Sequence, residues 1–197
     1  RLGEEGERIA VELTAGTVLA NKYVVRRRLG SGWEGEVFLV RERCTGIERA
    51  AKFFYPQRNR GNRALRFHAR KTHKLRHCPV LVQYLTQEQI DYHGVTLPFL
   101  VSEFVEGELL SAFLRRQPEH RLHPFQALHL LHALAVGVEP IHQLGEYHGD
   151  IHASNVIVER YGLGFALKLI DMYRLDAPRA EKIHLDVCDL IYLFYQA

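Results

Sequence analysis

Three acidic or amide side chains between positions 148 and 171 stand at or near the ends of apolar segments, where they could bind a cation or orient a reacting group. Asp150 is followed five residues later by Asn155, which runs directly into the apolar segment Val156-Ile157-Val158. Asp171 ends another apolar run, 167–170. A carboxylate at the end of a buried strand is costly unless it is paired or bound to a cation. We interpret Asp150 as the group that orients an acceptor hydroxyl and takes its proton, and Asn155 and Asp171 as ligands of one Mg²⁺ ion.

The same segment allows a rival interpretation as a metallohydrolase site. His148, Asp150 and His152 alternate and could share one face of an extended segment. Further ligands would then have to come from elsewhere, and Asn155 and Asp171 would have no role. A plain polar loop is the remaining alternative.

A glycine-rich turn and a lysine in the first quarter of the chain add a possible phosphate-binding part. The turn is Gly30-Ser31-Gly32-Trp33-Glu34-Gly35, and the residues after it alternate like a strand, whereas a dinucleotide fingerprint needs a helix there. Taken alone, an ordinary hairpin explains the turn equally well. Lys52 lies inside an apolar strand and must either reach water or meet an anion. Its place after the turn suits the α- and β-phosphates of a nucleotide, and the alternative is an edge-strand lysine.

Composition limits the class of protein. The 197 residues are 47% hydrophobic and 25% charged, which is typical of a globular chain with a real core. The net charge of +3 does not demand nucleic-acid binding. Cys44, Cys78 and Cys188 lie far apart, which favours reduced thiols in a cytoplasmic compartment over disulfides or zinc. The longest apolar run, 130–138, is too short to span a bilayer, and no signal peptide is visible.

Periodicity predicts strands in the first half of the chain and mainly helices in the second. Three apolar runs between residues 23 and 55 predict an antiparallel meander, residues 62–76 a helix, and residues 81–85 and 96–104 two more strands. Strands first and helices later favour an α+β fold.

The second half is expected to contain three helices and one hairpin. Helices are expected at 109–115, from Pro124 to before Gly145, and at 185–196, with short strands at 156–158 and 166–170. In the long helix, five apolar residues are predicted to share one buried face. They are Leu128, Leu131, Ala135, Val138 and Ile141.

Taken together and in this order, these motifs resemble those of the protein-kinase-like superfamily, from Tyr23 to the chain end. The resemblance implies a two-lobed α+β fold with ATP and Mg²⁺ as cofactors. The N-lobe, residues 1–102, would hold an antiparallel sheet and one helix. A hinge would follow at 103–107, and a minimal, mainly helical C-lobe at 108–197.

The resemblance also assigns roles to individual residues. Asp150 and Lys52 would be catalytic, and Asn155 and Asp171 would bind the metal. Val37, Ala50 and Ile157 would enclose the adenine. Glu103 and Val105 would offer hinge backbone groups, with Ser102 as a small gatekeeper. The full set expected to contact the nucleotide is Gly30, Ser31, Gly32, Gly35, Val37, Ala50, Lys52, Ser102, Glu103, Val105 and Ile157.

The resemblance is split between branches of the superfamily. The half up to Lys52 is similar to serine/threonine protein kinases. His148-Gly149-Asp150-Ile151-His152 is similar to the loop of aminoglycoside and choline phosphotransferases, and residues 169–174 with Asp189 are similar to lipopolysaccharide-core sugar kinases. We expect a phosphotransferase, first a serine/threonine protein kinase, with a small-molecule or sugar kinase and a nucleotide-binding pseudokinase as alternatives. The acceptor would be a protein or small-molecule hydroxyl, and no nucleic-acid partner or membrane span is expected.

Several positions depart from the protein-kinase pattern. Gly149 stands where regulated kinases carry an arginine, and Met172-Tyr173 follows the expected metal-binding Asp171. If Asp186 is the structural aspartate of the next helix, the segment before it is too short for a usual activation loop.

The most consequential departure concerns the acid that should pair with Lys52. Counting along the helix 62–76 places His68 where the family has a glutamate. The sequence offers Glu88, Glu103 and Asp171 as replacements, with Asp171 favoured.

Overall fold

The chain forms two compact units, seen in a computed structural model that describes residues 11–162 and 164–197. The first unit contains residues 11–73 together with Gln83–Phe104, and the second contains Lys74–Val82 together with Val105–Ala197. Residues 1–10 of the expected N-lobe lie outside the described residues. The second unit thus includes a short segment, Lys74–Val82, that a simple division of the sequence at 103–107 assigns to the N-lobe. The expected lobe boundaries and the hinge at 103–107 stay predictions.

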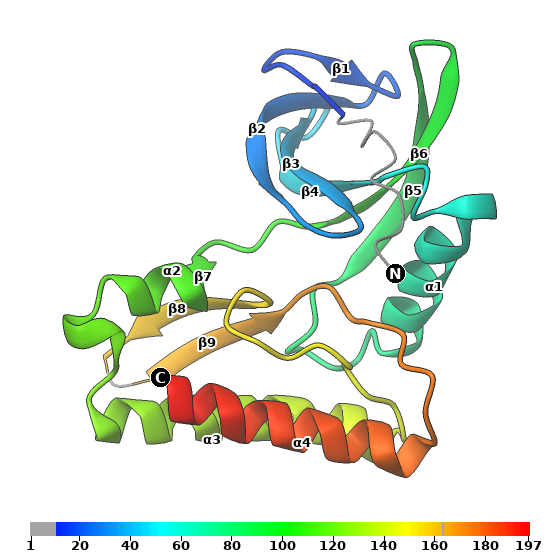
Figure 1. The fold of residues 1–197 in the computed structure, drawn as a ribbon. Coiled ribbons are helices and arrows are strands. Elements are labelled where there is room, and N and C mark those ends of the chain that lie inside the picture. The colour runs from blue at the N-terminus through cyan, green and yellow to red at the C-terminus, as the bar shows by residue number, and fades with distance from the viewer. Residues whose placement is uncertain (1–10, 163) are drawn as a thin grey trace, which may run out of the picture. The chain divides into compact units, whose positions relative to one another are not determined.

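The first unit is built on a six-stranded sheet (Figure 1) in the order β1-β2-β3-β4-β6-β5, with antiparallel neighbours. Its strands are β1 (Val18–Leu19), β2 (Tyr23–Ser31), β3 (Gly35–Glu42), β4 (Glu48–Phe54), β5 (Tyr84–Tyr92) and β6 (Val95–Glu103). One 3₁₀ turn, η1 (Arg60–Asn62), leads into helix α1 (Arg63–Lys74). The expected meander and helix are present.

Side chains alternate across this sheet, and one face carries the core of the unit. Phe38, Ala51, Phe53 and Phe99 are almost completely buried, and the rings of Phe53 and Phe99 stack with centroids 4.6 Å apart. Residues one position away along each strand therefore point to the opposite face. That opposite face includes Lys52.

The expected strand at 81–85 is wrong. Leu81 makes only an isolated bridge to Leu169, and the strand begins at Tyr84. Val80 and Leu81 are buried in the core of the second unit. Their apolar character thus reflects anchoring in that core, and periodicity cannot separate such an anchor from a short buried strand.

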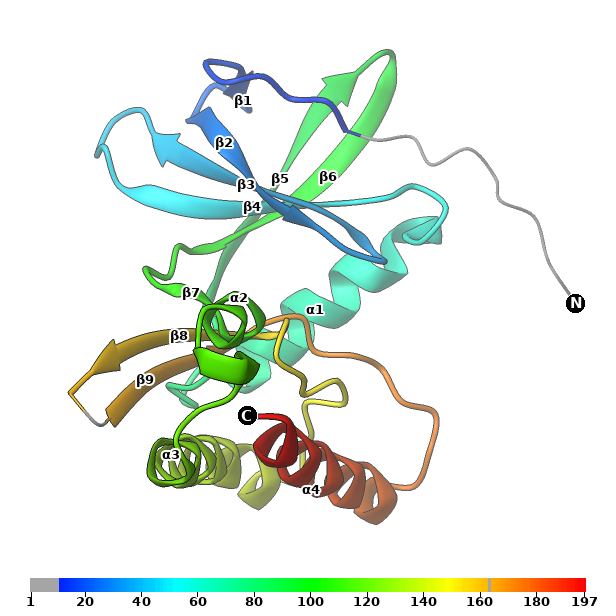
Figure 2. The same ribbon diagram turned by 60° about the vertical axis from the view of Figure 1, so that its left-hand side comes forward.

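The second unit combines a three-stranded antiparallel sheet with helices. Strands β7 (Glu108–Leu109), β8 (Val156–Tyr161) and β9 (Gly164–Leu169) lie in that order. The helices are α2 (Leu110–Arg115), α3 (Pro124–Gln143) and α4 (Arg179–Gln196), with a 3₁₀ turn, η2 (Pro118–His120), between the first two. Figure 2 shows α3 and α4 side by side. Helix α4 begins six residues before the expected start at Leu185.

Helix α3 begins at Pro124 as expected, with His123 and Gln126 forming a capping box. Its buried residues are Ala127, Leu130, Leu134, Val138 and Ile141. The expected face is therefore partly wrong, since Leu128 is 53% exposed. The helix carries apolar residues on two sides because it contacts β9 on one side and α4 on another.

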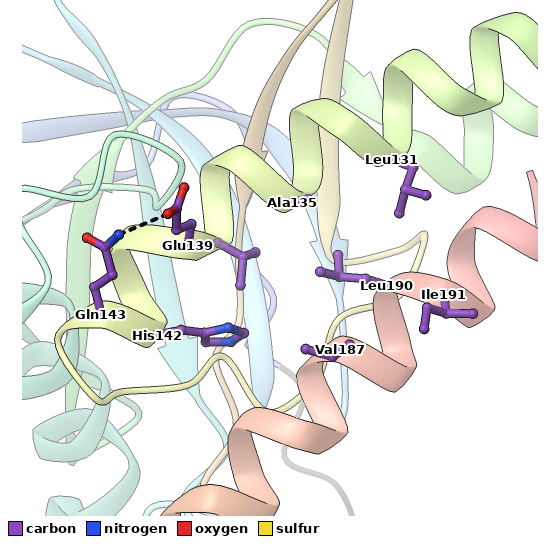
Figure 3. Close-up of a pocket in the computed structure, with 9 residues that line it drawn as sticks. Leu131, Ala135, Glu139, His142, Gln143, Val187, Leu190 and Ile191 are labelled. Atoms are coloured by element: carbon purple, nitrogen blue, oxygen red, sulfur yellow. Dashed lines mark hydrogen bonds between the residues drawn. The ribbon is translucent and has the colours of Figure 1, made fainter.

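Helices α3 and α4 leave an apolar groove between them (Figure 3). Leu131 and Ala135 of α3 face Val187 and Ile191 of α4 across it. At one end, Gln143 donates a hydrogen bond of 2.9 Å to Glu139. Leu131 and Ala135 of the predicted face line this groove and are not among the buried residues of α3, so the predicted face is partly displaced from the core face.

No helix in the described part of the chain is long and apolar enough to cross a membrane.

Candidate active site

The glycine-rich turn lies between β2 and β3 and is tied to the strand that carries Lys52. The amide of Gly32 donates to the carbonyl of Gly35 over 2.9 Å, and the amide of Tyr55 donates to the carbonyl of Glu34 over 2.8 Å. A Cβ atom on Gly35 would lie 1.9 Å from the carbonyl oxygen of Phe53. Only glycine allows the turn to approach β4 this closely.

Strand register places four of the expected nucleotide-contacting residues on one face of the first unit's sheet. Val37 is the direct partner of Lys52, and Ala50 is the direct partner of Ser102. Directly opposite residues point to the same side, and Ala50 and Lys52 are two positions apart on one strand. On this face of the sheet, the small and apolar side chains of Val37, Ala50 and Ser102 therefore lie beside the ammonium group of Lys52.

The ammonium of Lys52 contacts an acid that the sequence did not suggest. Its Nζ atom donates to Oε2 of Glu34 over 3.2 Å, and the same oxygen lies 2.6 Å from Nε2 of His68 on α1. Glu34 is outside the three candidates considered from the sequence. Of those, Glu88 pairs with Lys22, and the carboxylate of Glu103 accepts the amide of Gln83 over 2.9 Å. Asp171 belongs to the second unit, and its pairing with Lys52 stays a prediction.

The charge of Glu34 is stabilised by its two partners. Burial alone would raise the pKa of this carboxyl, but the hydrogen bond from His68 and the positive charge of Lys52 outweigh burial and hold the pKa below its usual value. Glu34 is therefore a carboxylate near neutral pH. A signal existed in the sequence, because an acid inside a glycine turn that precedes the lysine strand is within reach of that lysine.

In the second unit, the loop that carries Asp150 is held by Asp186 of α4. Asp186 is fully buried, and its oxygens accept the amides of His148 and Gly149, each over 2.7 Å. The same carboxylate contacts Nε2 of His142 over 2.9 Å. Three donors thus satisfy one buried charge, as a buried carboxylate requires.

Gly149 has a backbone geometry that suits no other residue at this point of the loop. Its φ is +87°, and a Cβ atom would lie 2.7 Å from the carbonyl oxygen of Tyr173. The glycine that replaces the family's arginine is therefore built into the local fold.

Asp150 and Asn155 form the centre of the loop. Nδ2 of Asn155 donates to the backbone oxygen and to Oδ2 of Asp150, each over 2.9 Å. His152 lies 3.5 Å from the same carboxylate through its Nε2 atom. The side chain of Asp150 is nearly half exposed, so an acceptor hydroxyl can reach it.

The β8–β9 hairpin brings Asn155 close to the strand end that carries Asp171. Val156 pairs with Leu169, and the amide of Ile170 donates to the carbonyl of Asn155 over 3.0 Å. Asp171 has a φ of +57°, a left-handed conformation that is uncommon for a residue with a side chain and often marks a functional position.

The two residues fit the chemistry of Mg²⁺. The amide nitrogen of Asn155 is used in bonds to Asp150, which leaves its oxygen for other contacts. An amide oxygen and a carboxylate are the hard ligands that Mg²⁺ prefers. Within the described ranges, no group of three or more His, Cys, Asp or Glu side chains is arranged to hold a metal ion.

The metallohydrolase interpretation does not suit this geometry. His148 is completely buried, whereas the side chains of Asp150 and His152 are about half exposed. The three alternating residues therefore do not present one common face.

Asp189, one turn after Asp186 on α4, also faces this loop. Burial raises its pKa, and the nearby negative charges of Asp186 and Asp150 add to the increase, while the backbone amide of Ile151 and the charge of His152 oppose it. The second unit thus gathers three carboxyl groups around one loop.

The remaining residues expected to contact the nucleotide are divided between the two units. Gly30 and Ser31 end β2, and Ser102 and Glu103 end β6 in the first unit. The amide of Glu103 donates to the carbonyl of Gln83 over 3.0 Å. Val105 and Ile157 belong to the second unit.

An antiparallel sheet with one helix, followed by a mainly helical unit with paired Asp and Asn in its loop, is the architecture of phosphotransferases of the kinase type. Residues 23–173 match the family described as the protein kinase domain. The chain belongs to this family, and the predicted superfamily is confirmed.

Curated relatives agree with this assignment. The serine/threonine-protein kinase pkn2 of Myxococcus xanthus is 34% identical over 168 residues, which cover 83% of this chain and 19% of that protein. The serine/threonine-protein kinase PrkC of Bacillus subtilis is 26% identical over 150 residues, which cover 75% of this chain and 22% of that protein. The chain spans about a fifth of the length of these relatives.

Solved structures confirm the fold. The crystal structure of the Mycobacterium tuberculosis PknI kinase domain matches with a TM-score of 0.69 at 21% sequence identity, covering 94% of this chain and 79% of that chain. The predicted two-lobed α+β fold of the protein-kinase type is therefore confirmed.

Proposed function

We propose that this chain catalyses transfer of the γ-phosphoryl group of ATP to a serine or threonine hydroxyl of a protein, with Mg²⁺ as cofactor. The observation that carries the proposal is the hydrogen-bonded pair of Asp150 and Asn155, held by buried Asp186, in a member of the protein kinase domain family. Relatives named as serine/threonine-protein kinases support the choice of acceptor.

In this proposal, the residues of the second unit handle the acceptor and the metal. Asp150 orients the hydroxyl and takes its proton as the oxygen bonds to the γ-phosphorus and the bond to the β-phosphate oxygen breaks. Asn155 holds the carboxylate of Asp150 through one hydrogen bond to Oδ2 and ties to the same residue through a second bond to its backbone oxygen. Asn155 and Asp171 would hold Mg²⁺, which neutralises charge on the phosphates when bound.

The residues of the first unit are proposed to bind the nucleotide. Lys52 binds the α- and β-phosphates, and the glycine turn from Gly30 to Gly35 contacts the phosphates through its backbone. Val37 and Ala50 form part of the adenine surface, with Ser102 beside it as their strand register suggests. Glu103, Val105 and Ile157 are the further contacts we assign to the base.

The test is ADP formation by the purified chain with Mg-ATP and a protein acceptor. We expect Asp150→Ala to lower the rate by about 10²- to 10⁴-fold, the usual contribution of a positioned acid–base group. Asp176→Ala, which changes an exposed aspartate of the same unit, is the matched control. Chelation of Mg²⁺ should abolish ADP formation, and restored Mg²⁺ should return it.

Mass spectrometry of the products identifies the acceptor class. Phosphate on Ser or Thr of the chain or an added protein supports the proposal. Phosphate found only on an aminoglycoside, choline or a sugar would contradict it in favour of a small-molecule kinase. Nucleotide binding without turnover on any acceptor would make the chain a pseudokinase.

We further propose that the chain works in the cytoplasm and without a nucleic-acid partner. All three cysteines are free thiols, which supports a reducing compartment. The small net charge of +3 supports the second point.

A further inference from the structure

Position 68 of α1 carries an imidazole where a kinase helix usually carries an acid, yet this side chain still lies close to Lys52 through a shared contact with Glu34. His68 is buried, and its ring lies 5.4 Å from that of Phe54, on the strand that carries Lys52. The ammonium of Lys52 lies 5.1 Å from the centre of the Phe54 ring. The ammonium and the imidazole thus pack against one aromatic side chain, and a carboxylate placed between them can accept a hydrogen bond from each.

Glu34 provides that charge from the glycine turn. Its Oε2 atom contacts both Nε2 of His68 and Nζ of Lys52, at 2.6 and 3.2 Å. The side chains of Lys52 and His68 are 15% and 8% exposed, so solvent screens these contacts only weakly.

The backbone around Glu34 fixes the position of its side chain. Its carbonyl accepts the amide of Tyr55, and Gly35 packs directly on the carbonyl of Phe53. The guanidinium of Arg58 stacks on the ring of Trp33, with Cζ 3.3 Å from the ring centre. The turn is therefore held on both sides of Glu34, by β4 and by the segment that follows it.

We propose that Glu34, held by His68, replaces the missing helix acid as the group that positions Lys52. Glu34 is then a positioning residue and not a catalytic one, and its role in phosphate binding rests on the function proposed above. Because the acid sits on the turn rather than on α1, the orientation of Lys52 depends on the position of the turn.

The direct test is the chemical reactivity of the Lys52 amine, which requires no nucleotide and no activity. An acylating reagent reacts only with a neutral amine, and a neighbouring carboxylate favours the charged form. We expect Glu34→Gln to raise the acylation rate of Lys52 by about three- to tenfold. Mass spectrometry of the modified chain measures this rate. Lys22, which pairs with Glu88, is the internal reference and should not change.

A second variant separates positioning from simple loss of structure. His68→Glu places an acid at the helix position that faces Lys52, so the double variant Glu34→Gln/His68→Glu should return Lys52 to slow acylation. Glu42→Gln, which removes a carboxylate paired with Arg49 over 2.7 Å on β3, is the matched control and should leave Lys52 unchanged. Unchanged Lys52 reactivity in Glu34→Gln, or no recovery in the double variant, overturns the inference.

ATP turnover, measured on the same variants, distinguishes the two proposals. If the unaltered chain turns over ATP, Glu34→Gln should raise KM for ATP more than it lowers kcat, and the double variant should recover. If the unaltered chain shows no turnover while Lys52 reactivity changes as expected, the proposed function fails and the inference on Glu34 stands. If the unaltered chain turns over ATP but Lys52 reactivity does not change in Glu34→Gln, the inference on Glu34 fails and the proposed function stands.

Discussion

At the scale of single residues, the second unit depends on how its carboxyl groups are satisfied. Asp186 is completely buried and accepts two backbone amides and one imidazole contact. Asp189, three residues later, has a raised pKa because burial and neighbouring carboxylates disfavour its charge. We therefore expect these two aspartates of one helix to affect stability in opposite directions.

We predict that Asp186→Ala destabilises the chain by about 3 kcal/mol or more, since it leaves the amides of His148 and Gly149 buried without their acceptor. Denaturant unfolding followed by circular dichroism measures the loss. Asp176→Ala on the exposed segment before α4 is the control, with an expected change under about 0.5 kcal/mol. A small effect of Asp186→Ala would show that the loop finds other acceptors.

Asp189→Asn is expected to stabilise the chain at neutral pH. The folded state raises the pKa of this carboxyl, so stability falls as pH rises from the ordinary aspartate value of about 3.9 through the raised value, and the full penalty is present above it. Asparagine removes the penalty and keeps an oxygen for the amide of Ile151. Melting temperatures of both proteins should differ at pH 7 and converge below about pH 4. A lower melting temperature for the variant at pH 7 would contradict this assignment.

At the scale of elements, the glycine turn is shaped by its contact with β4. Gly35 approaches the carbonyl of Phe53 so closely that a methyl group cannot be accommodated without moving the turn. Gly30, five residues earlier, has no atom within 4 Å of a Cβ position. Close packing on β4 therefore requires a glycine at position 35 and does not require one at position 30.

We predict that Gly35→Ala destabilises the first unit by about 1–3 kcal/mol, the usual effect of overpacking, whereas Gly30→Ala changes stability by less than about 0.5 kcal/mol. Urea unfolding monitored by tryptophan fluorescence suits this comparison, because the one tryptophan, Trp33, lies in the turn. Equal effects of the two substitutions would mean that the turn does not rest on β4.

At the scale of the whole molecule, the residues assigned to nucleotide and metal are divided between the two units. Lys52 and Glu34 belong to the first, whereas Asp150, Asn155 and Asp171 belong to the second. A nucleotide that binds the folded chain stabilises it by mass action, in proportion to the logarithm of its concentration relative to Kd.

We predict that Mg-ADP raises the melting temperature of the chain, equivalent to about 2.7 kcal/mol at a hundredfold excess over Kd. Asp171→Asn should remove the Mg²⁺-dependent part of the increase, which is measured as the difference between ADP with Mg²⁺ and ADP with a chelator. Asp176→Asn should retain it. A Mg²⁺-dependent shift that survives Asp171→Asn would remove Asp171 from the metal ligands.

Much of the fold could be predicted because periodicity and turn chemistry are local. The alternation around Phe38 and Phe53 marks β3 and β4, and Pro124 with its capping residues marks the start of α3. The predicted strand position of Leu81 and the predicted burial of Leu128 are wrong because neither depends on local sequence alone. Their burial depends on which distant elements pack against them, and a local pattern does not carry this information.

The amino-acid sequence by itself determined the superfamily and the α+β order of elements. It also singled out Asp150, Asn155 and Asp171, because these rest on residue type, spacing and the strands beside them. Only the tertiary structure revealed that Lys52 meets Glu34. Glu34, Lys52 and His68 lie 18 and 16 residues apart along the chain, and the contact exists because the turn folds onto β4 beside α1. Spacing along the sequence cannot encode such a meeting, since it depends on the packing of three separate elements.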